Sequence, residues 1–201
     1  MRILVVKNND EGQRIDKFLQ KTLNNIPQSL LYKYFRKKCI KINGKKANPE
    51  DILKCGDEIR LFISDEFFEK DNKTENFKRD FCILKQDEII YEDDNIMILD
   101  KPAGELVHSG SFDAENKNSD EICLADRLVG YLYKKGEYNP EDENCFVPAL
   151  CNRLDRNTCG LVIAAKNAKA LRIMNQKIKD REIQKKYLCL VYGHLSKKEG
   201  K

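Results

Sequence analysis

The chain has 201 residues, and its 37 Lys and Arg against 33 Asp and Glu give a formal net charge of +4 at pH 7. Apolar residues make up 41% of it and charged residues 35%, which is typical of a globular protein with a strongly solvated surface. No apolar run approaches the roughly 20 residues of a membrane-spanning helix, and "RILVVK" is too short for a signal-peptide core. We therefore expect a cytoplasmic protein of one or two domains with no membrane partner.

Charge is distributed unevenly along the chain. Residues 1–65 contain 14 basic and 8 acidic side chains, a net charge of +6, which leaves residues 66–201 with 23 basic and 25 acidic side chains. A basic part joined to a slightly acidic part predicts two domains with different roles.

Eight cysteines raise the question of a disulfide framework or a zinc site. No Cys-x-x-Cys spacing occurs, however, and the two histidines, His108 and His194, are far apart in the sequence. Most of the cysteines have apolar neighbours, as in "FCIL" and "YLCLVY", where a free thiol is a small buried side chain in a reducing compartment. We expect neither disulfides nor a bound metal.

Two short amphipathic helices are the first predicted elements. The stretch "GQRIDKFLQKTLNN" has apolar residues at helical spacing, and "PQSLLYKYFRKKC" repeats the pattern. After them, "IKINGKKA" predicts a strand and a tight turn at Asn43 and Gly44, and "KCGDEIRLFI" predicts a turn that leads into a second strand.

Basic residues gather between Leu30 and Ala47, a stretch with no acidic residue. Unbalanced charge repels itself unless an anion neutralises it, although a solvated lysine-rich surface is the alternative interpretation. The order helix, helix, basic turn, "KINGKKA", "GDEI" resembles the small alpha-L RNA-binding domain of ribosomal and RNA-modifying proteins, over about residues 12–64. With that resemblance, RNA contact is assigned to Lys33, Arg36, Lys37, Lys38, Lys41 and Lys45.

Residues 65–86 are expected to form a linker, because they mix both charges and lack a sustained period of 2 or 3.6. Four aromatic side chains argue against a wholly free tether, since such side chains usually pack against something: Phe67, Phe68, Phe77 and Phe81.

Further strands and a helix are predicted in the second part. The stretch "EIIYEDDNIMILDKPAGELVHSG" predicts a strand, an acidic turn, a second strand and a Pro-Gly loop, and "GLVIAAK" predicts a buried central strand. A helix follows in "NAKALRIMNQKIKDREI", with Leu171, Met174 and Ile178 on one side, and "KKYLCLVYG" predicts a last strand. Residues 98–104 and 153–160 then lie at strand ends, where loops commonly carry chemistry.

Arg153 and Asp155 stand two residues apart at the entrance to an apolar run. If this segment is extended, both side chains point to the same face. An Arg beside a carboxylate lowers its pKa, so the pair suits either a structural ion pair or a charged catalytic group. The Arg could also reach a phosphate or fill the space left by an extruded base.

Three motifs in order, "YEDDNIMILDKPAGELVH", "NRLDRNTCGLVIAAKN" and "KKYLCLVYG", resemble those of the RluA/RluD-type pseudouridine synthases of ribosomal RNA, over about residues 89–193. The resemblance implies an α+β protein with an alpha-L domain at 1–64, a linker at 65–86 and a catalytic domain with a mixed, mostly antiparallel sheet at 87–201. It implies RNA, most simply ribosomal RNA, as the partner and no cofactor.

The resemblance also implies roles for individual residues. By motif position Asp155 is the catalytic aspartate, Arg153 its charged neighbour, and Tyr187 the active-site tyrosine that stacks on the uracil or helps to move the C5 proton. The supporting positions are Lys101, Pro102, Gly104, Asn152, Thr158 and Gly160. The family usually has His at the position of Asn152 and Ser at that of Cys159, and neither change removes a group that the mechanism requires.

Two alternatives remain open at this stage. The second part could dock on the ribosome without catalysis, or the protein could be a carboxylate-dependent glycosidase, which the lack of an obvious second carboxylate disfavours. The relatives continue well past "KKYLCLVYGHLSKKEGK", so we expect the chain to be a truncated product or fragment that binds RNA and is weakly active or inactive. The target uridine and the oligomeric state are left undetermined.

Overall fold

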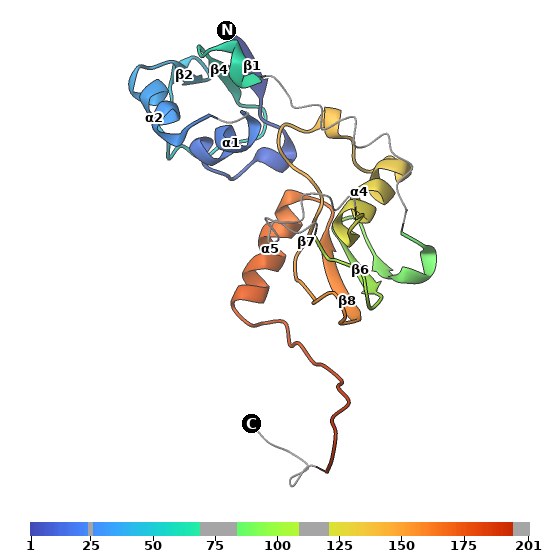
Figure 1. The fold of residues 1–201 in the computed structure, drawn as a ribbon. Helices are drawn as coiled ribbons and strands as arrows, with labels where there is room; N and C mark the ends of the chain where they lie inside the picture. Colours follow the sequence, from blue (N-terminus) through green and yellow to red (C-terminus); the bar gives the residue numbers. More distant parts are fainter. Residues whose placement is uncertain (24–25, 69–83, 109–120, 195–201) are drawn as a thin grey trace.

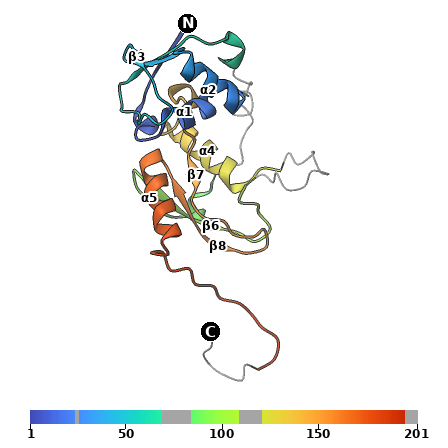
Figure 2. The same ribbon diagram turned by 90° about the vertical axis from the view of Figure 1, so that its left-hand side faces the viewer.

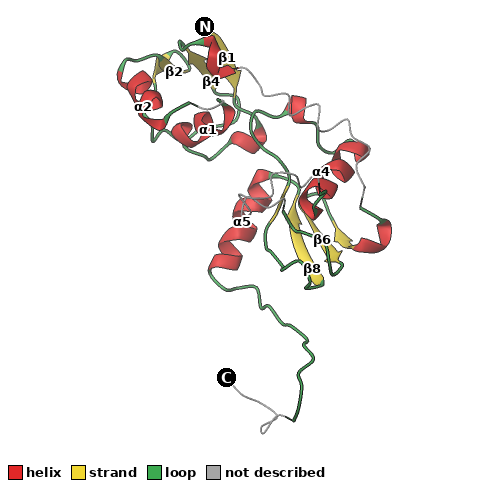
Figure 3. Ribbon diagram, viewed as in Figure 1, coloured by secondary structure: helices red, strands yellow, loops and turns green. Residues whose placement is uncertain are grey.

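The computed structural model describes residues 1–23, 26–68, 84–108 and 121–194. Within these ranges the chain forms two four-stranded antiparallel sheets, each with helices and a hydrophobic core of its own (Figure 1). In Figure 2 the first part lies above the second. Both parts combine helices with antiparallel strands (Figure 3), which confirms the predicted α+β class.

The first part combines one sheet with two helices. In spatial order its strands are β1 (Arg2–Val5), β4 (Glu58–Leu61), β2 (Ile40–Ile42) and β3 (Lys45–Lys46), and its helices are α1 (Ile15–Thr22) and α2 (Gln28–Arg36). Both predicted helices are confirmed because their apolar stripes, with Phe18 and Leu31 fully buried, pack against the sheet. The assignment of this part as an alpha-L domain stays a prediction.

The predicted turn at Asn43 and Gly44 is confirmed. Both residues have positive φ, 50° and 79°, as a two-residue turn between right-twisted strands requires. Strand β1 was not predicted, because its short apolar run has no alternation that would identify it. It pairs along its length with β4, so its extended conformation depends on a partner more than fifty residues away in sequence.

The second part is built on β6 (Ile96–Lys101) and β8 (Gly160–Ala165), which pair antiparallel from Ile96 opposite Ala165 to Lys101 opposite Gly160. Strand β5 (Ile89–Glu92) lies beyond β6, and β7 (Ala149–Leu150) lies beyond β8. Helix α4 (Leu124–Lys135) buries Leu128 and Leu132 in the core with Met97 and Val162, and α5 (Ala168–Lys179) follows β8 directly.

The expectation that β8 is buried on both faces is wrong. The strand is central, as predicted, and Val162 and Ala164 are fully buried in the core beneath α4. Leu161 points to the other face and is 57% exposed. An apolar run identifies a strand in the middle of a sheet, but whether both faces are covered depends on elements elsewhere in the chain.

The expected strand over 185–193 is also wrong. These residues form neither helix nor strand, and they extend away from the second sheet (Figures 1 and 2). Leu188, Leu190 and Tyr192 are fully exposed. A strand needs the backbone of a neighbour to satisfy its hydrogen bonds, and no described strand pairs with this segment.

Part of the predicted linker packs against the first part. A short 3-10 turn, Asp65–Phe68, places Phe67 and Phe68 against its core, and the Arg2 guanidinium lies 4.8 Å from the Phe68 ring centre. Phe77 and Phe81 lie outside the described residues, so the domain boundaries stay a prediction. In the part of the chain that the structure describes, no helix is long and apolar enough to cross a membrane.

The two parts meet at a polar junction that the sequence did not indicate. The Asn144 amide donates to the Val5 carbonyl at 2.8 Å and to the buried Asp10 carboxylate at 2.6 Å. Asn9 donates to the Glu143 carboxylate at 2.7 Å and accepts from the Ala168 amide at the start of α5. Residues more than 130 positions apart thus fasten the parts together.

Glu143 is the member of this junction whose burial is unfavourable. One oxygen of its carboxylate is buried and has no hydrogen-bond partner among the described residues. Burial raises its pKa, and the nearby Asp10 adds to the effect. A carboxyl group with a raised pKa destabilises the folded state once the pH exceeds its unfolded pKa of about 4.3. The destabilisation is therefore present at neutral pH and absent in acid.

We expect Glu143→Gln to raise the melting temperature at pH 7 by about 2–4 °C, the shift that about 1 kcal/mol produces in a chain of this size. The gain should shrink toward zero as the pH approaches 4, because the wild-type carboxyl is then protonated. Glu141→Gln, an exposed neighbour, is the control and should have no such effect. A gain that is equal at both pH values would contradict the role of the charge.

Candidate active site and nucleic-acid interface

The candidate active site lies where β6 ends and β8 begins. Because these strands are antiparallel and Lys101 pairs with Gly160, the loop after β6 and the loop before β8 emerge at the same end of the sheet. This brings the first two motifs of the sequence together, although they are about fifty residues apart. The supporting residues predicted from the sequence belong to these two loops.

Lys101 joins the two loops from beneath. Its side chain is fully buried, and its ammonium group donates to the carbonyls of Pro102 at 2.8 Å, Glu105 at 2.9 Å and Arg156 at 3.0 Å. An ammonium group has three protons, so these three acceptors satisfy it completely. One buried cation therefore fixes the backbone on both sides of the site.

Gly104 and Arg156 form a second connection between the two loops. The Gly104 amide donates to the Arg156 carbonyl at 2.8 Å, and Nε of Arg156 donates back to the Gly104 carbonyl at 3.0 Å. The guanidinium group of Arg156 also pairs with Glu121 at 2.7 Å, just before α4. Gly104 has φ +93°, which a residue with a Cβ rarely adopts.

Asp155 occupies the turn that this scaffold holds. The Thr158 amide donates to the Asp155 carbonyl at 3.0 Å and closes the turn, and Gly160, with φ +129°, leads from it into β8. The Asp155 side chain is exposed and makes no hydrogen bond or ion pair with the described chain. Its carboxylate is thus available to a ligand on a turn with a fixed backbone.

A structural ion pair between Arg153 and Asp155 was one of the two interpretations of their spacing. The two side chains form no ion pair, because residues 153–155 are irregular and lead into a turn, so the alternation of an extended strand does not apply. Arg153 lies instead near His108. Burial lowers the pKa of His108, and the positive charge of Arg153 lowers it further.

Asn152 holds the approach to the turn. Its side-chain carbonyl accepts from the Ile163 amide at 2.8 Å, and its amide group donates to the Leu161 carbonyl at 3.3 Å. Both contacts continue the ladder of β8 past the end of the short strand β7. The Asn152 side chain therefore stabilises the backbone that leads into the turn. Cys159 is exposed.

Tyr187 is not brought to this site. It lies in the extended segment that leaves the body of the protein, with 65% of its surface exposed and no hydrogen bond to the described chain. The structure thus assembles the first two motifs and leaves the third apart from them.

Arg127 supports the same loop and was missed in the sequence. It is buried on α4 and pairs with Glu88 at 2.5 Å and with Glu105 at 2.8 Å. Glu105 belongs to the loop that Lys101 holds, so α4 is tied to it by charge. The only feature of the sequence that indicated its role was a single Arg within the apolar stripe of a helix.

In the described ranges no group of His, Cys, Asp and Glu could hold a metal.

The basic surface of the first part surrounds the end of α2 and the following hairpin. Lys33, Arg36 and Lys37 are exposed on the last turn of α2 and at its cap, and Lys38 follows with φ 61°. Lys45 is exposed on β3, and Lys41 lies 5.4 Å from the Phe62 ring centre.

Two further cations belong to this surface. Lys41 on β2 stands directly opposite Lys46 on β3 and Arg60 on β4, so three positive side chains cross the sheet in one row. Like charges opposite each other destabilise a sheet unless an anion neutralises them. Glu58 pairs with Arg60, whereas no described acidic side chain pairs with Lys41 or Lys46. Arg60 was missed because it is more than ten residues beyond the basic cluster; only its alternation with Ile59 and Leu61 indicated an outward position.

The second part of the chain is similar in sequence to a known protein family. Residues 95–201, more than half of the chain, match the sequence profile of the family described as RNA pseudouridylate synthase. The chain belongs to this family. The resemblance to pseudouridine synthases is thereby confirmed, and the matched region contains both loops of the candidate site.

The curated relatives extend the similarity to nearly the whole chain. Ribosomal large subunit pseudouridine synthase C of Escherichia coli is 32% identical over 193 residues, which is 96% of this chain and 55% of the relative. The protein of the same name from Buchnera aphidicola subsp. Baizongia pistaciae is 35% identical, over 94% of this chain and 55% of the relative. The chain spans about half the length of these relatives.

Among solved structures, the human protein named RNA pseudouridylate synthase domain containing 4 is similar at 22% identity with a TM-score of 0.35. The alignment covers 48% of this chain and 31% of the other.

We expect Lys101→Met to destabilise the protein by about 2–4 kcal/mol, because it removes the three hydrogen bonds of the buried ammonium group and leaves the Arg156 carbonyl with the Gly104 amide as its remaining donor. The reason is the lost ammonium group and not the lost chain length, since Met fills much of the same space. Chemical denaturation measures the change, and faster hydrogen exchange of the Thr158 amide would locate it at the turn.

Lys134→Met is the matched control, because Lys134 is exposed on α4 and makes no hydrogen bond or ion pair with the described chain. It should change stability by less than about 0.5 kcal/mol. Equal effects of the two substitutions would show that Lys101 does not hold the loops.

Proposed function

We propose that this chain contains the catalytic aspartate and the RNA-binding surface of an enzyme that isomerises uridine to pseudouridine in RNA. The observation that carries the proposal is the geometry of Asp155, an exposed and unpaired carboxylate on a turn whose backbone is held by the buried Lys101. The motif position of Asp155, within the region that matches the family, supports this assignment. Because the relatives are named for the large ribosomal subunit, its RNA is the proposed substrate, and the cytoplasm is the proposed location.

The chemistry requires an ionised carboxylate beside a sugar. The bond between ribose C1′ and N1 of uracil breaks, the base turns, and C1′ forms a bond to C5, after which the C5 proton leaves. Positive character develops on the sugar as the base departs. Asp155 either attacks C1′ as a nucleophile or removes a sugar proton to give a glycal-like intermediate. Both routes need the carboxylate in its charged form.

Arg153 and Tyr187 have proposed roles that depend on the substrate. Arg153 makes no hydrogen bond or ion pair with the described chain, so its guanidinium group is available to a phosphate of the extruded nucleotide. Tyr187 stacks on the uracil only if its segment folds against the sheet, because it is exposed in this structure.

A non-catalytic RNA-binding protein is the alternative function. The observation that favours it is the exposure of Tyr187 in a segment that forms no strand, which leaves the site without its third motif. Both functions require RNA binding, but only the catalytic one releases the C5 proton of uridine.

An RNA transcript that carries tritium at C5 of uridine tests the catalytic proposal. With the 201-residue chain in excess over a large-subunit RNA transcript, pseudouridine formation releases the tritium to water. We expect slow release by the wild-type chain and none by Asp155→Asn, because the substitution keeps size and removes only the charge. Both proteins should bind the transcript equally.

Asp94→Asn is the matched control, since Asp94 is exposed near the opposite end of β6. It should release tritium at the wild-type rate. Activity of Asp155→Asn within about tenfold of wild type would refute the assignment of the catalytic group. RNA binding by the wild-type chain without any release would favour the non-catalytic alternative.

The basic surface makes a separate prediction about affinity. Replacing Lys33, Arg36 and Lys37 together by Gln should weaken RNA binding and flatten its salt dependence. The slope of log affinity against log salt should fall by up to about 0.7–0.9 for each phosphate contact that is lost. Titrations at several salt concentrations measure the slope.

A matched triple variant, with Gln at the exposed positions Lys134, Lys169 and Lys179, removes the same charge from the second part. Its slope should stay closer to that of the wild type. Equal slopes for the two triple variants would mean that the end of α2 has no special role in holding RNA.

A further inference from the structure

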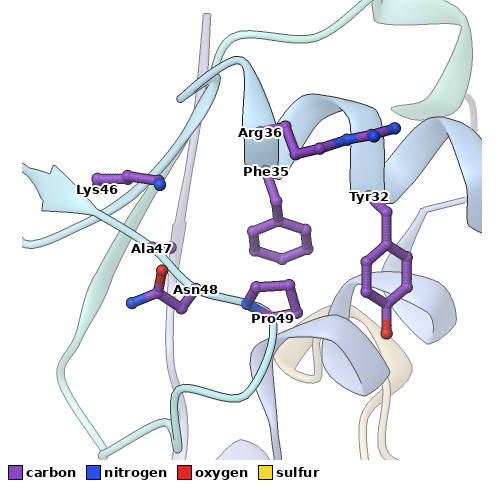
Figure 4. Close-up of a pocket in the computed structure, with 7 residues that line it drawn as sticks. All are labelled: Tyr32, Phe35, Arg36, Lys46, Ala47, Asn48 and Pro49. Atoms are coloured by element: carbon purple, nitrogen blue, oxygen red, sulfur yellow. The ribbon is translucent and has the colours of Figure 1, made fainter.

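A pocket of about 510 Å³ opens on the basic surface, between α2 and the segment that follows β3. Its volume is in the range of about 300–1,000 Å³ typical of small-ligand sites. Figure 4 shows the Phe35 ring pointing toward Pro49, with Tyr32 on one side and Asn48 and Lys46 on the other. The lining residues are Tyr32, Phe35, Arg36, Lys46, Ala47, Asn48 and Pro49.

The base of the pocket is apolar and rigid. Phe35 and Ala47 are buried in the core of the first part. The Tyr32 hydroxyl donates to the buried Asp16 carboxylate at 3.0 Å, and Asp16 is itself paired with Arg14 at 2.9 Å. The tyrosine ring is therefore held in place before any ligand arrives, which reduces the entropy lost on binding.

The rim of the pocket is polar, and its side chains have no partners among the described residues. The side chains of Arg36, Lys46 and Asn48 make no hydrogen bond or ion pair with the described chain. They offer a planar guanidinium group, an ammonium group and an amide that both donates and accepts. A ligand with a flat apolar ring, a hydrogen-bonding edge and a negative charge would satisfy all three.

We propose that this pocket binds one unpaired nucleotide of RNA. The base lies between the apolar floor and the Arg36 guanidinium plane, the Asn48 amide contacts the edge of the base, and Lys46 contacts its phosphate. The surrounding charge supports an anionic strand as the occupant, because residues 30–47 contain seven basic residues and no acidic one. The inference rests on RNA binding by the first part and does not depend on catalysis.

The test compares two probes of equal charge, an octamer of uridine and an octamer of abasic ribose phosphate. Stacking of a base on a protein side chain contributes about 1–3 kcal/mol, so we expect the wild-type chain to prefer the uridine octamer by about 5- to 100-fold. Arg36→Lys keeps the charge and removes the plane, so it should reduce the preference at least threefold and leave the salt slope unchanged. Asn48→Ala should also reduce the preference.

Arg181→Lys is the control, because Arg181 is exposed and lies outside both the basic surface and the pocket. It should leave the preference intact. Arg36 and Asn48 are exposed, and equal melting temperatures would verify that their variants are folded.

Four results would overturn the pocket: equal affinity of the wild-type chain for both octamers, an undiminished preference in Arg36→Lys, an equal loss in Arg181→Lys, or octaglutamate binding as tightly as octauridine. Tritium release without a base preference would refute the pocket alone, and a base preference without release would refute catalysis alone.

Discussion

The buried ammonium group of Lys101 is the interaction on which the candidate site depends. Three carbonyls from two loops converge on it, and no carboxylate does. Because a buried cation is tolerated only when its protons are satisfied, the loops cannot separate without a large loss of stability. The turn that carries Asp155 therefore has a fixed backbone while its carboxylate faces solvent. Catalytic groups that must meet a flexible RNA need this combination of a rigid support and an open side.

The basic surface and the candidate catalytic residue belong to different parts of the molecule. The first part presents a row of basic side chains across its sheet, and its apolar pocket lies beside that row. The second part presents the Asp155 carboxylate. A junction of Asn9, Glu143 and Asn144 joins the two parts through hydrogen bonds. These contacts hold the basic surface in a defined position relative to Asp155.

Local patterns predicted the elements that owe their form to nearby residues. The helices around Phe18 and Leu31 have their own apolar stripes, and the turn at Asn43 and Gly44 follows from the positive φ that these residues tolerate. The expected strand over 185–193 failed because a strand needs a partner that its own sequence does not contain. The ion pair of Arg153 with Asp155, one of two interpretations that the sequence allowed, does not form because the chain turns there.

By itself the sequence determined the family, the α+β class, Asp155 as the candidate catalytic residue and the existence of a basic surface, because motifs and charge are properties of the chain. The tertiary structure alone decided that Lys101 lies beneath the site, that Arg153 stands near His108, and that Lys46 and Asn48 complete a pocket with Arg36. These facts depend on which loops the antiparallel pairing of distant strands brings together, and strand pairing is a relation between segments that no single segment contains.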